Sequence, residues 1–443
     1  MSPGDPFCYE GFDLDPGQGL LTCRYSLGER EFAEKITFDR AGDWDAPGVA
    51  QAARLICLLA GVSYYKTAAP SVVDLGQFPV TAAELEFLRT FYLDGLGEFA
   101  YRNELDLSAL QFTGGVIGGP ADRGPRRGPD GPHAMLSPFG GGIDSIVTVE
   151  LVRGRGDAAL FVMSRPGDRF AAIERPAAVT GLPVVRAGRE IDPQLLRSAE
   201  LGFLTGHVPV TGILSAIAVM AALLDGRDAV VMSNEWSASA PTLKVGGRVI
   251  NHQYSKSMEF EEGFRGVLAG ALGGGLTYFS ALRPFTELWV ARKFAGLTRY
   301  HATFRSCNRA FQIDPALRLD HWCGRCDKCC FIDLILAPFL PAGGLRQIFG
   351  GAEPLDDPSL AERFRALLGT SAASKPFECV GEIGECRAAA VLAAARPDRA
   401  GTALLHELTA QFPPPDPPTI EALLRPVGEH WIPDAYAADD LLV

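Results

Sequence analysis

Short apolar runs alternate with helical patterns through the middle of the chain, and this alternation is the feature that most restricts the fold. The apolar runs span Ala134 to Phe139, Ala158 to Met163, Val184 to Ala187, Asp228 to Ser233 and Leu276 to Leu282. Helical patterns lie between them, at Asp144 to Arg153, Arg169 to Thr180, Gly212 to Leu224 and Glu259 to Leu272. Such alternation predicts βαβ crossovers and a mostly parallel α/β sheet with helices on both faces. A sheet of this kind binds ligands at the carboxyl ends of its strands.

Two regions of different character flank this stretch. Leu20 to Leu27 and Glu31 to Phe38 predict a hairpin, and helices are expected over Pro47 to Leu59 and Ala82 to Asn103. Glycine, proline and charged residues then replace all apolar periodicity. We therefore expect four parts: a mixed α+β N-terminal domain at 1–117, a linker or exposed loop at 118–132, an α/β domain at 133–340 and a helical C-terminal extension at 341–443.

The net charge and the apolar stretches argue against two classes of partner. The 443 residues include 41 Lys and Arg against 53 Asp and Glu, a formal charge of −12, whereas a nucleic-acid binder normally has a basic face. The longest apolar stretch, Gly212 to Leu224, is shorter than the roughly 20 residues of a membrane-spanning helix. The first residues lack a signal-peptide pattern. We expect a cytoplasmic protein that binds neither nucleic acid nor membrane and has no obligate protein partner.

The segment Ser137 to Val152 has the pattern of a phosphate-binding loop: a short strand, three glycines, Asp and Ser, then an amphipathic helix. Glycines let the backbone approach an anion, and the N–H groups at the helix start point at it. Asp144 either caps the helix or holds a Mg²⁺ that accompanies phosphates, and Ser145 adds a hydroxyl. The alternative is an ordinary glycine-rich turn with an Asp cap. The predicted nucleotide contacts are Gly140, Gly141, Gly142, Asp144 and Ser145.

This GGGIDS loop resembles the SGGxDS signature of the PP-loop ATP pyrophosphatase superfamily, with Gly140 in place of the usual Ser. Members bind ATP and transfer AMP to a substrate oxygen. His207 to Ala218 is similar to the second nucleotide-facing turn of that superfamily, and Leu282 to Ala295 to its late strand-to-helix element. The resemblance implies an adenine nucleotide alpha hydrolase-like fold for 133–340, ATP and Mg²⁺ as cofactors, and a nucleotide contact from His207.

Five of the ten cysteines lie close together near residue 320. Cys323, Cys326 and Cys329 are separated by two residues each, and Cys307 precedes them. This spacing is typical of a structural Zn²⁺ site with four thiolate ligands. Two alternatives stay open: Cys329 or Cys330 transfers protons as a thiol of lowered pKa near Lys328, or the cysteines are plain core residues.

Four longer stretches sharpen the resemblance: GVSYYKTAAP at 61–70, SNEWSAS at 233–239, VINHQYSKSMEFE at 249–261 and HWCGRCDKCCFIDLILAPFL at 321–340. With the glycine loop, they are similar to the UDP-N-acetylmuramoyl-L-alanyl-L-glutamate epimerase family, often called MurL. The resemblance implies conversion of the terminal L-Glu of UDP-MurNAc-L-Ala-L-Glu to D-Glu for peptidoglycan synthesis, with ATP becoming AMP and pyrophosphate. Trp236 and the Ser239-Ala240 pair depart from the polar residues expected there, which leaves their substrate role open.

Proton carriers in such a reaction must be titratable and close to the carboxyl edge of the sheet. Each candidate has a plainer alternative: a helix cap for Glu235, a loop hydrogen bond for His252, a solvated face for Glu259, and a surface or packing position for Lys66 and Arg102. The catalytic candidates are Asp144, Glu235, His252, Lys256 and Cys330. The candidates for substrate binding are Lys66, Arg102, Asn234, Asn251, Tyr254 and Glu259, of which Lys66 and Arg102 belong to an N-terminal substrate-binding domain.

Three other functions compete with epimerisation. An adenylating ligase that forms amides or nitriles would use the same loop; the start Met1-Ser2-Pro3 lacks the Cys of glutamine-fed members, which leaves free ammonia as the nitrogen source. A tRNA-thiolating enzyme would use Cys329 or Cys330, and the acidic charge disfavours it. A non-catalytic nucleotide or zinc module is disfavoured by the intact Asp144-Ser145 pair.

Overall fold

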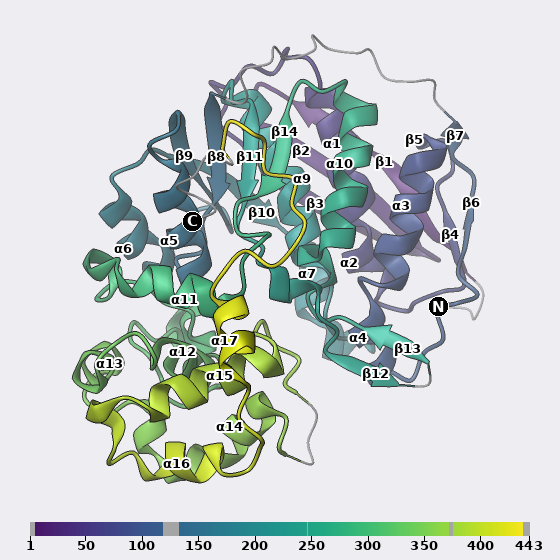
Figure 1. The fold of residues 1–443 in the computed structure, drawn as a ribbon. Helices are drawn as coiled ribbons and strands as arrows, with labels where there is room; N and C mark the ends of the chain where they lie inside the picture. Colours follow the sequence, from purple (N-terminus) through teal and green to yellow (C-terminus); the bar gives the residue numbers. More distant parts are fainter. Residues whose placement is uncertain (1–4, 118–132, 246, 372–374, 437–443) are drawn as a thin grey trace.

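A ten-stranded sheet forms the centre of the computed structural model, which describes residues 5–117, 133–245, 247–371 and 375–436 (Figure 1). Its strand order is β14-β11-β8-β9-β10-β3-β2-β1-β4-β6. These strands are β1 (Phe7–Asp15), β2 (Leu20–Leu27), β3 (Arg30–Thr37), β4 (Val72–Asp74), β6 (Gln111–Thr113), β8 (Ala134–Pro138), β9 (Asp157–Ser164), β10 (Val184–Glu190), β11 (Ala229–Met232) and β14 (Thr277–Ser280). Two small sheets pair β5 (Pro79–Val80) with β7 (Val116–Ile117) and β12 (Leu243–Val245) with β13 (Arg248–Ile250).

The sheet is mostly parallel, as the alternation predicts. β14, β11, β8, β9 and β10 are parallel neighbours and correspond to the five apolar runs. The predicted hairpin forms β2 and β3, and β3 pairs antiparallel with β10. The N-terminal strands therefore continue the same sheet, so 1–117 and 133–340 share one sheet rather than having one each. The predicted linker at 118–132 lies outside the described residues.

Helices cover both faces of this sheet (Figure 1). α1 (Val49–Ala60), α9 (Val210–Leu224) and α10 (Met258–Leu272) pack on one face, and α5 (Ile143–Val152), α6 (Ala171–Thr180) and α11 (Glu287–Ala295) pack on the other. Successive residues of β8 point to opposite faces of the sheet. Leu136 therefore lies in the core beneath α1, α9 and α10, and Met135 lies in the core beneath α5, α6 and α11. Coverage of both faces explains why the strands are continuous apolar runs. The other helices before residue 300 are α2 (Val62–Tyr65), α3 (Ala82–Leu93), α4 (Gly97–Arg102), α7 (Pro193–Leu196) and α8 (Ser198–Leu201).

The single helix predicted over Ala82 to Asn103 is wrong, because the chain breaks it into α3 and α4. A Cβ at Gly95 would lie 2.3 Å from the carbonyl oxygen of Phe91. The backbone therefore turns back on itself more tightly there than a residue with a side chain allows. This break sets the direction of α4, which carries Glu98 and Arg102.

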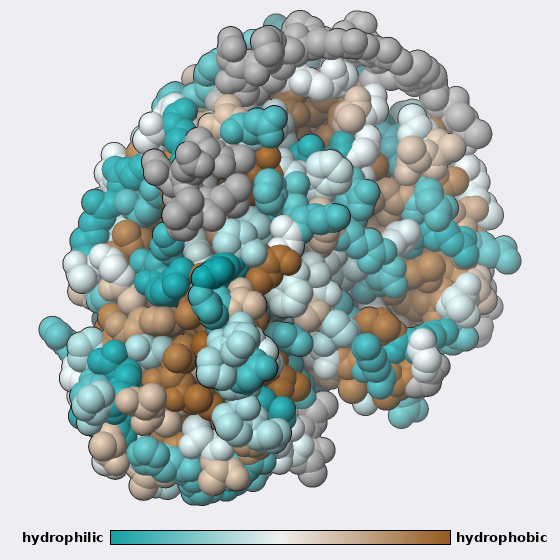
Figure 2. All heavy atoms as spheres, viewed as in Figure 1, coloured by the Kyte–Doolittle hydropathy of each residue, from teal (hydrophilic) through white to brown (hydrophobic). Residues whose placement is uncertain are grey.

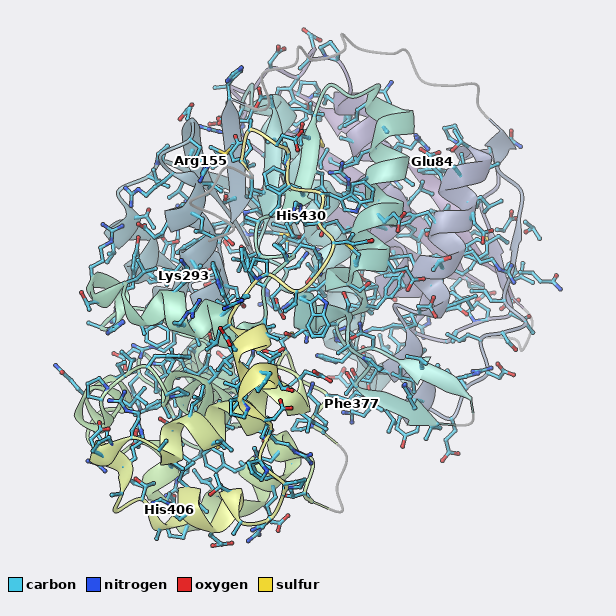
Figure 3. The ribbon with its side chains drawn as sticks, viewed as in Figure 1. Glu84, Arg155, Lys293, Phe377, His406 and His430 are labelled. Atoms are coloured by element: carbon cyan, nitrogen blue, oxygen red, sulfur yellow. The ribbon has the colours of Figure 1, made fainter. Side chains whose placement is uncertain are left out.

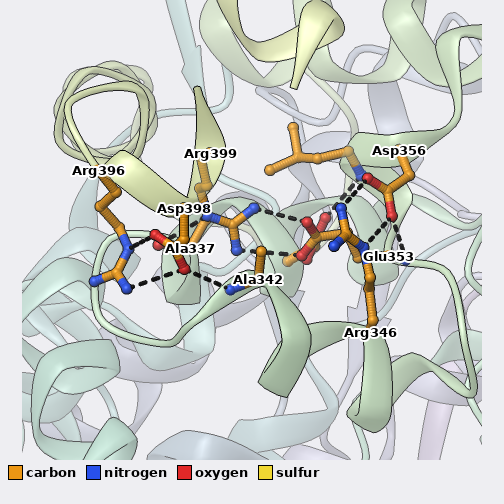
Figure 4. A network of polar contacts seen from close by, with 10 residues as sticks. Ala337, Ala342, Arg346, Glu353, Asp356, Arg396, Asp398 and Arg399 are labelled. Atoms are coloured by element: carbon orange, nitrogen blue, oxygen red, sulfur yellow. Dashed lines mark hydrogen bonds and ion pairs between the residues drawn. The ribbon is translucent and has the colours of Figure 1, made fainter. Parts of the chain in front are cut away.

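The C-terminal helices form a separate layer below the sheet in Figure 1. A buried ion pair between Glu353 and Arg399, 2.7 Å between Oε1 and Nη1, joins the loop after α13 to the loop after α15 (Figure 4). Arg399 also donates a hydrogen bond to the carbonyl of Ala337. Leaving either charge unpaired would cost several kcal/mol, so the pair holds these loops together. The helices are α12 (Asp327–Leu336), α13 (Ala342–Phe349), α14 (Ala361–Leu368), α15 (Ile383–Ala394), α16 (Ala403–Thr409) and α17 (Pro417–Leu423).

Hydrophilic and hydrophobic residues are interspersed over the face of the molecule in Figure 2. Val249, Ile313 and Leu317 are each about three-fifths exposed, and scattered apolar side chains of this kind are common on folded proteins. Within the described ranges, none of the helices has both the length and the apolar composition needed to cross a bilayer.

Candidate functional site

The glycine loop joins the carboxyl end of β8 to the first turn of α5. Gly141 has φ +78°, and a Cβ there would lie 2.3 Å from the carbonyl oxygen of Ala172, so this position requires glycine. Gly140 faces open space, with room for the Ser usual in the superfamily motif. Gly142 is the N-terminal cap of α5, whose first N–H groups are free of helical partners and suit an anion. The Ser145 hydroxyl donates to the carbonyl of Gly142 at 3.1 Å.

Three adjacent strands each deliver one carboxylate beside this loop. Asp144 follows β8, Glu235 follows β11 and Glu287 follows β14, and their oxygen atoms lie within 4.8 Å of one another. Burial and the neighbouring Glu235 raise the pKa of Asp144 to about 7. Burial and Asp144 also raise the pKa of Glu287 well above its usual range. Oxygen ligands of this kind, crowded and partly buried, fit a hard cation such as Mg²⁺.

Several buried polar atoms at this edge of the sheet have no hydrogen-bond partner within the part of the chain that the structure describes. They include Asp144 Oδ1 and Glu287 Oε2 from the carboxylate group, and Ser137 Oγ, Ser233 Oγ and Asn234 Nδ2 from the ends of β8 and β11. Buried polar groups in folded proteins are normally paired. Unpaired atoms gathered around a glycine loop therefore mark a place for a polar ligand.

Lys256 connects the carboxylates to a thiol that the sequence analysis did not single out. Burial lowers the pKa of Lys256, but the charges of Cys379, Glu235 and Asp144 outweigh burial and raise it overall. Burial raises the pKa of Cys379, whereas Lys256, a hydrogen bond with His252 and Lys328 bring it down to about 6. The neighbouring cations therefore favour the thiolate form of Cys379.

A histidine pair extends the site toward the N-terminal region. His252 Nδ1 contacts Glu98 Oε2, and the rings of His252 and His207 lie 4.3 Å apart. Burial lowers the pKa of His252, but hydrogen bonds with Cys379 and Glu98 raise it to about 9. Burial and the charge of His252 lower the pKa of His207 to about 4. His252 is therefore a cation and His207 a neutral ring at pH 7.

The two N-terminal cations predicted to bind substrate lie at this pair. Arg102 Nε donates to Glu98 Oε1 at 2.6 Å, and half of its side chain is exposed. Lys66 Nζ donates to the carbonyl of Gly206 at 3.0 Å, and its charge acts on His207. The structure thus brings Lys66, Arg102, His207 and His252 together, whereas His207 had been expected at the nucleotide.

A buried ion pair positions the loops that carry Glu235 and Lys256. Arg283 and Glu261 are 1% and 0% exposed, and Arg283 Nε donates to Glu261 Oε2 at 2.9 Å. The same guanidinium donates to the carbonyls of Glu235 at 3.0 Å and Lys256 at 2.8 Å. The Glu261 carboxylate therefore anchors this arginine.

Four predicted residues lie in surroundings that favour other roles. Asn251 donates to the carbonyl of Ala238 within the loop, Tyr254 packs in the core, and Glu259 is exposed on α10. Cys330 is fully buried in α12, and burial raises the pKa of its thiol. A proton carrier must reach its substrate, so burial weighs against Cys330 as a catalytic residue.

The four cysteines predicted to bind zinc do lie together, within 4.8 Å of one another. Cys326 Sγ and Cys323 Sγ are 3.5 and 3.7 Å from Cys329 Sγ. Thiolates at the corners of a tetrahedron around Zn²⁺ are about 3.8 Å apart, given Zn–S bonds of about 2.3 Å. The cluster therefore fits Zn²⁺, and it holds the start of α12, which carries Lys328.

Three residues of the site were missed by sequence reasoning. Glu287 follows β14 as Glu235 follows β11, so the strand-end argument extended to the last strand would have found it. Glu98 sits inside a segment predicted as one long helix, where nothing marks it. Cys379 lies between α14 and α15, far along the chain from the cluster of cysteines near residue 320, and the sequence carries no signal for its position.

Two cavities accompany the site. One of about 630 Å³ lies beside α4 and β13 and is lined by apolar residues such as Leu93, Tyr101 and Ile250. A larger one of about 850 Å³ lies along β10, and none of the predicted site residues lines it. The predicted site residues line neither cavity, but the first lies beside α4, the helix that carries Arg102.

Comparison with known proteins identifies relatives along nearly the whole chain. The profile of the MurL N-terminal domain matches residues 2–281, and that of the MurL C-terminal domain matches residues 303–421. The UDP-N-acetyl-alpha-D-muramoyl-L-alanyl-L-glutamate epimerase of Xanthomonas oryzae pv. oryzae (strain MAFF 311018) is 39% identical over 95% of this chain and 94% of its own. Proteins of the same name from Salinispora tropica and a Micromonospora species are 40% and 36% identical, over 86% and 98% of this chain and 83% and 97% of theirs.

No solved structure matches the chain. Two domain profiles and relatives that are similar from end to end nevertheless agree with the family that the motifs indicate. The chain belongs to the MurL family.

Proposed function

We propose that this protein converts the terminal L-Glu of UDP-MurNAc-L-Ala-L-Glu to D-Glu by adenylating its carboxylate with ATP, releasing pyrophosphate and AMP. The names of the curated relatives support the substrate and the reaction class. The observation that carries the ATP-dependent mechanism is the set of unpaired buried atoms around the glycine loop, beside three carboxylates from adjacent strands. An adenine nucleotide alpha hydrolase-like fold for 133–340 is part of the same proposal.

Adenylation makes an otherwise unfavourable proton transfer accessible. The α-proton beside a free carboxylate is hard to remove, because the resulting carbanion faces an anion. Converting that carboxylate to an acyl-adenylate gives a neutral acyl group that can take the electron pair as an enolate. Water then releases the epimerised acid.

Different residues of this chain bind the phosphates, the metal ion and the substrate. The glycine loop and the first turn of α5 hold phosphate oxygens. Asp144, Glu235 and Glu287 would hold Mg²⁺, which neutralises the charge of the phosphates. Lys66 and Arg102 bind anionic groups of the substrate near Glu98, and the cavity of about 630 Å³ beside α4 can receive one of its rings.

The test is an incubation with ATP, Mg²⁺ and UDP-MurNAc-L-Ala-L-Glu in D₂O. We expect AMP, pyrophosphate and one deuterium at the glutamate α-carbon of a D-Glu product. Release of AMP without deuterium would contradict the epimerase and favour a ligase. Asp144→Asn should lower AMP formation at least 100-fold. Asp157→Asn should leave AMP formation unchanged, because Asp157 is an exposed acid at the first residue of β9, away from the carboxyl ends of the strands.

A further inference from the structure

Cys379 comes from the C-terminal extension, in the stretch between α14 and α15. Phe377 of the same stretch lies between the C-terminal helices and α4 in Figure 3. Its ring is 6.4 Å from that of His252 and 4.9 Å from the Arg102 guanidinium. These contacts seat the stretch against the histidine pair, so the C-terminal extension supplies one wall of the site.

The thiol is linked in a chain of polar groups. His252 hydrogen-bonds to Cys379 and presents Nδ1 to Glu98. Since Nδ1 is occupied by the carboxylate, Nε2 is the nitrogen left for the thiol. This order of groups, a thiol, an imidazole and a carboxylate, is the arrangement that activates cysteines in enzymes.

Cys379 differs from two buried cysteines outside the cluster of four. Cys23 and Cys386 are fully buried, and burial raises the pKa of each thiol well above the usual range. Cys379 is half-buried, and the cations Lys256, His252 and Lys328 face it from two elements. A Cβ at Gly381, two residues after Cys379, would lie 3.3 Å from Glu287 Cβ, so this stretch passes beside the carboxylate group.

Two independent observations point to a ligand at the carboxylate group that this stretch passes. Asn234 is 4% exposed, and its amide nitrogen has no partner within the ranges described. Glu287 is also 4% exposed and leaves Oε2 unpaired among the same residues, within 4.8 Å of Asp144 and Glu235. A substrate carboxylate activated at the carboxylate group would present its α-carbon a short distance away, and the stretch that carries Cys379 passes beside this group.

We propose that Cys379 is the catalytic residue that exchanges a proton with the glutamate α-carbon, and that His252, held by Glu98, positions its thiol. The inference rests on the proposed function. The Cys379 thiolate forms an S–H bond as the α-C–H bond breaks, and the electron pair moves into the activated acyl group as an enolate. Lys256 stabilises that negative charge. Reprotonation on the opposite face by a solvent-derived proton gives the D configuration.

The test separates adenylation from proton exchange in Cys379→Ala and Cys379→Ser variants. We expect deuterium uptake at the α-carbon to fall at least 100-fold, as for loss of a general base. Substrate-dependent exchange of radiolabelled pyrophosphate into ATP should stay within threefold of wild type. Cys8→Ala, at a half-buried thiol on β1, is the matched control and should leave both rates unchanged.

The outcomes distinguish a failure of the proposed function from a failure of the role proposed for Cys379. Wild-type protein that takes up no deuterium would refute the proposed function itself. Wild-type uptake that persists within threefold in Cys379→Ala would overturn only the role of Cys379. A parallel loss of pyrophosphate exchange and deuterium uptake would also overturn it, because it would place Cys379 in substrate binding.

Chemical labelling keeps the proposal testable if the variants do not fold. Iodoacetamide at pH 7 should alkylate Cys379 of the wild-type protein at least tenfold faster than Cys8, and deuterium uptake should fall in proportion. Alkylation of Cys379 that leaves uptake intact would overturn the proposal. His252→Gln should slow this alkylation at least tenfold, whereas a merely structural histidine would leave the rate unchanged or raise it by loosening the site.

Discussion

Replacing Gly141 with Ala should remove the activity while leaving the protein folded. The backbone at Gly141 has φ +78°, a conformation that costs a residue with a Cβ about 1–2 kcal/mol. The new Cβ would lie 2.3 Å from the Ala172 carbonyl oxygen, about 1 Å inside the ordinary contact of 3.4 Å. The loop or α6 must therefore move by about 1 Å. A misplacement of that size can lower a rate by about 100-fold.

The assay is substrate-dependent exchange of pyrophosphate into ATP, measured beside urea unfolding of the same preparation. Gly140→Ala is the matched control, because a Cβ at Gly140 meets open space and its φ is not positive. We expect Gly141→Ala to lose about 100-fold in kcat/KM and Gly140→Ala to stay within threefold. Equal rates for the two variants would refute the steric argument, and so would a Gly141→Ala protein with wild-type activity.

Three further predictions concern the buried charges and the cysteine cluster. Arg283→Met should destabilise the protein by about 3–5 kcal/mol in urea unfolding, because it leaves the buried Glu261 carboxylate unpaired. Arg24→Met, in an exposed ion pair, should cost about 1 kcal/mol or less. Similar losses of stability in the two variants would contradict this prediction. Burial raises the pKa of Glu385 to about 7, so its contribution to the free energy of unfolding is complete below its unfolded pKa near 4.5 and is lost as the pH rises through 7. Glu385→Gln should flatten the decline in urea midpoint between pH 5 and 8. An unchanged slope would refute this prediction. The purified protein should contain one Zn²⁺ per chain by elemental analysis, and Cys326→Ser should lose both the metal and several degrees of Tm; metal-free wild-type protein of full stability would contradict a structural zinc site.

The central sheet was predictable because its evidence is local. Each of the five apolar runs after residue 133 became a parallel strand, since burial on both faces demands a continuous apolar sequence. The pairing of β3 with β10 was not predictable, because the two strands are far apart in the chain and neither sequence pattern indicates its partner. The break at Gly95 was missed for a related reason: the helical periodicity resumes after it.

The site was predictable to the extent that strand ends and motifs marked it. Asp144 and Glu235 follow strands, and the structure does place them together. His207 shows the limit of this reasoning. A motif marked this residue as part of the site, but it did not predict that its ring would lie against that of His252. Cys379 could not be found at all, since its importance comes from Lys256 and His252, more than a hundred residues away in sequence.

The order in which the strands are synthesised has a consequence for the growing polypeptide. The glycine loop leaves the ribosome early, but the carboxylate after β14 comes much later, and Cys379 comes near the end of the chain. Non-local pairings such as these form only when all partners exist. An unfinished chain therefore carries a phosphate loop with neither its complete carboxylate group nor its thiol. On the proposed function, epimerisation is therefore a property that the growing chain acquires only after the stretch with Cys379 has been synthesised.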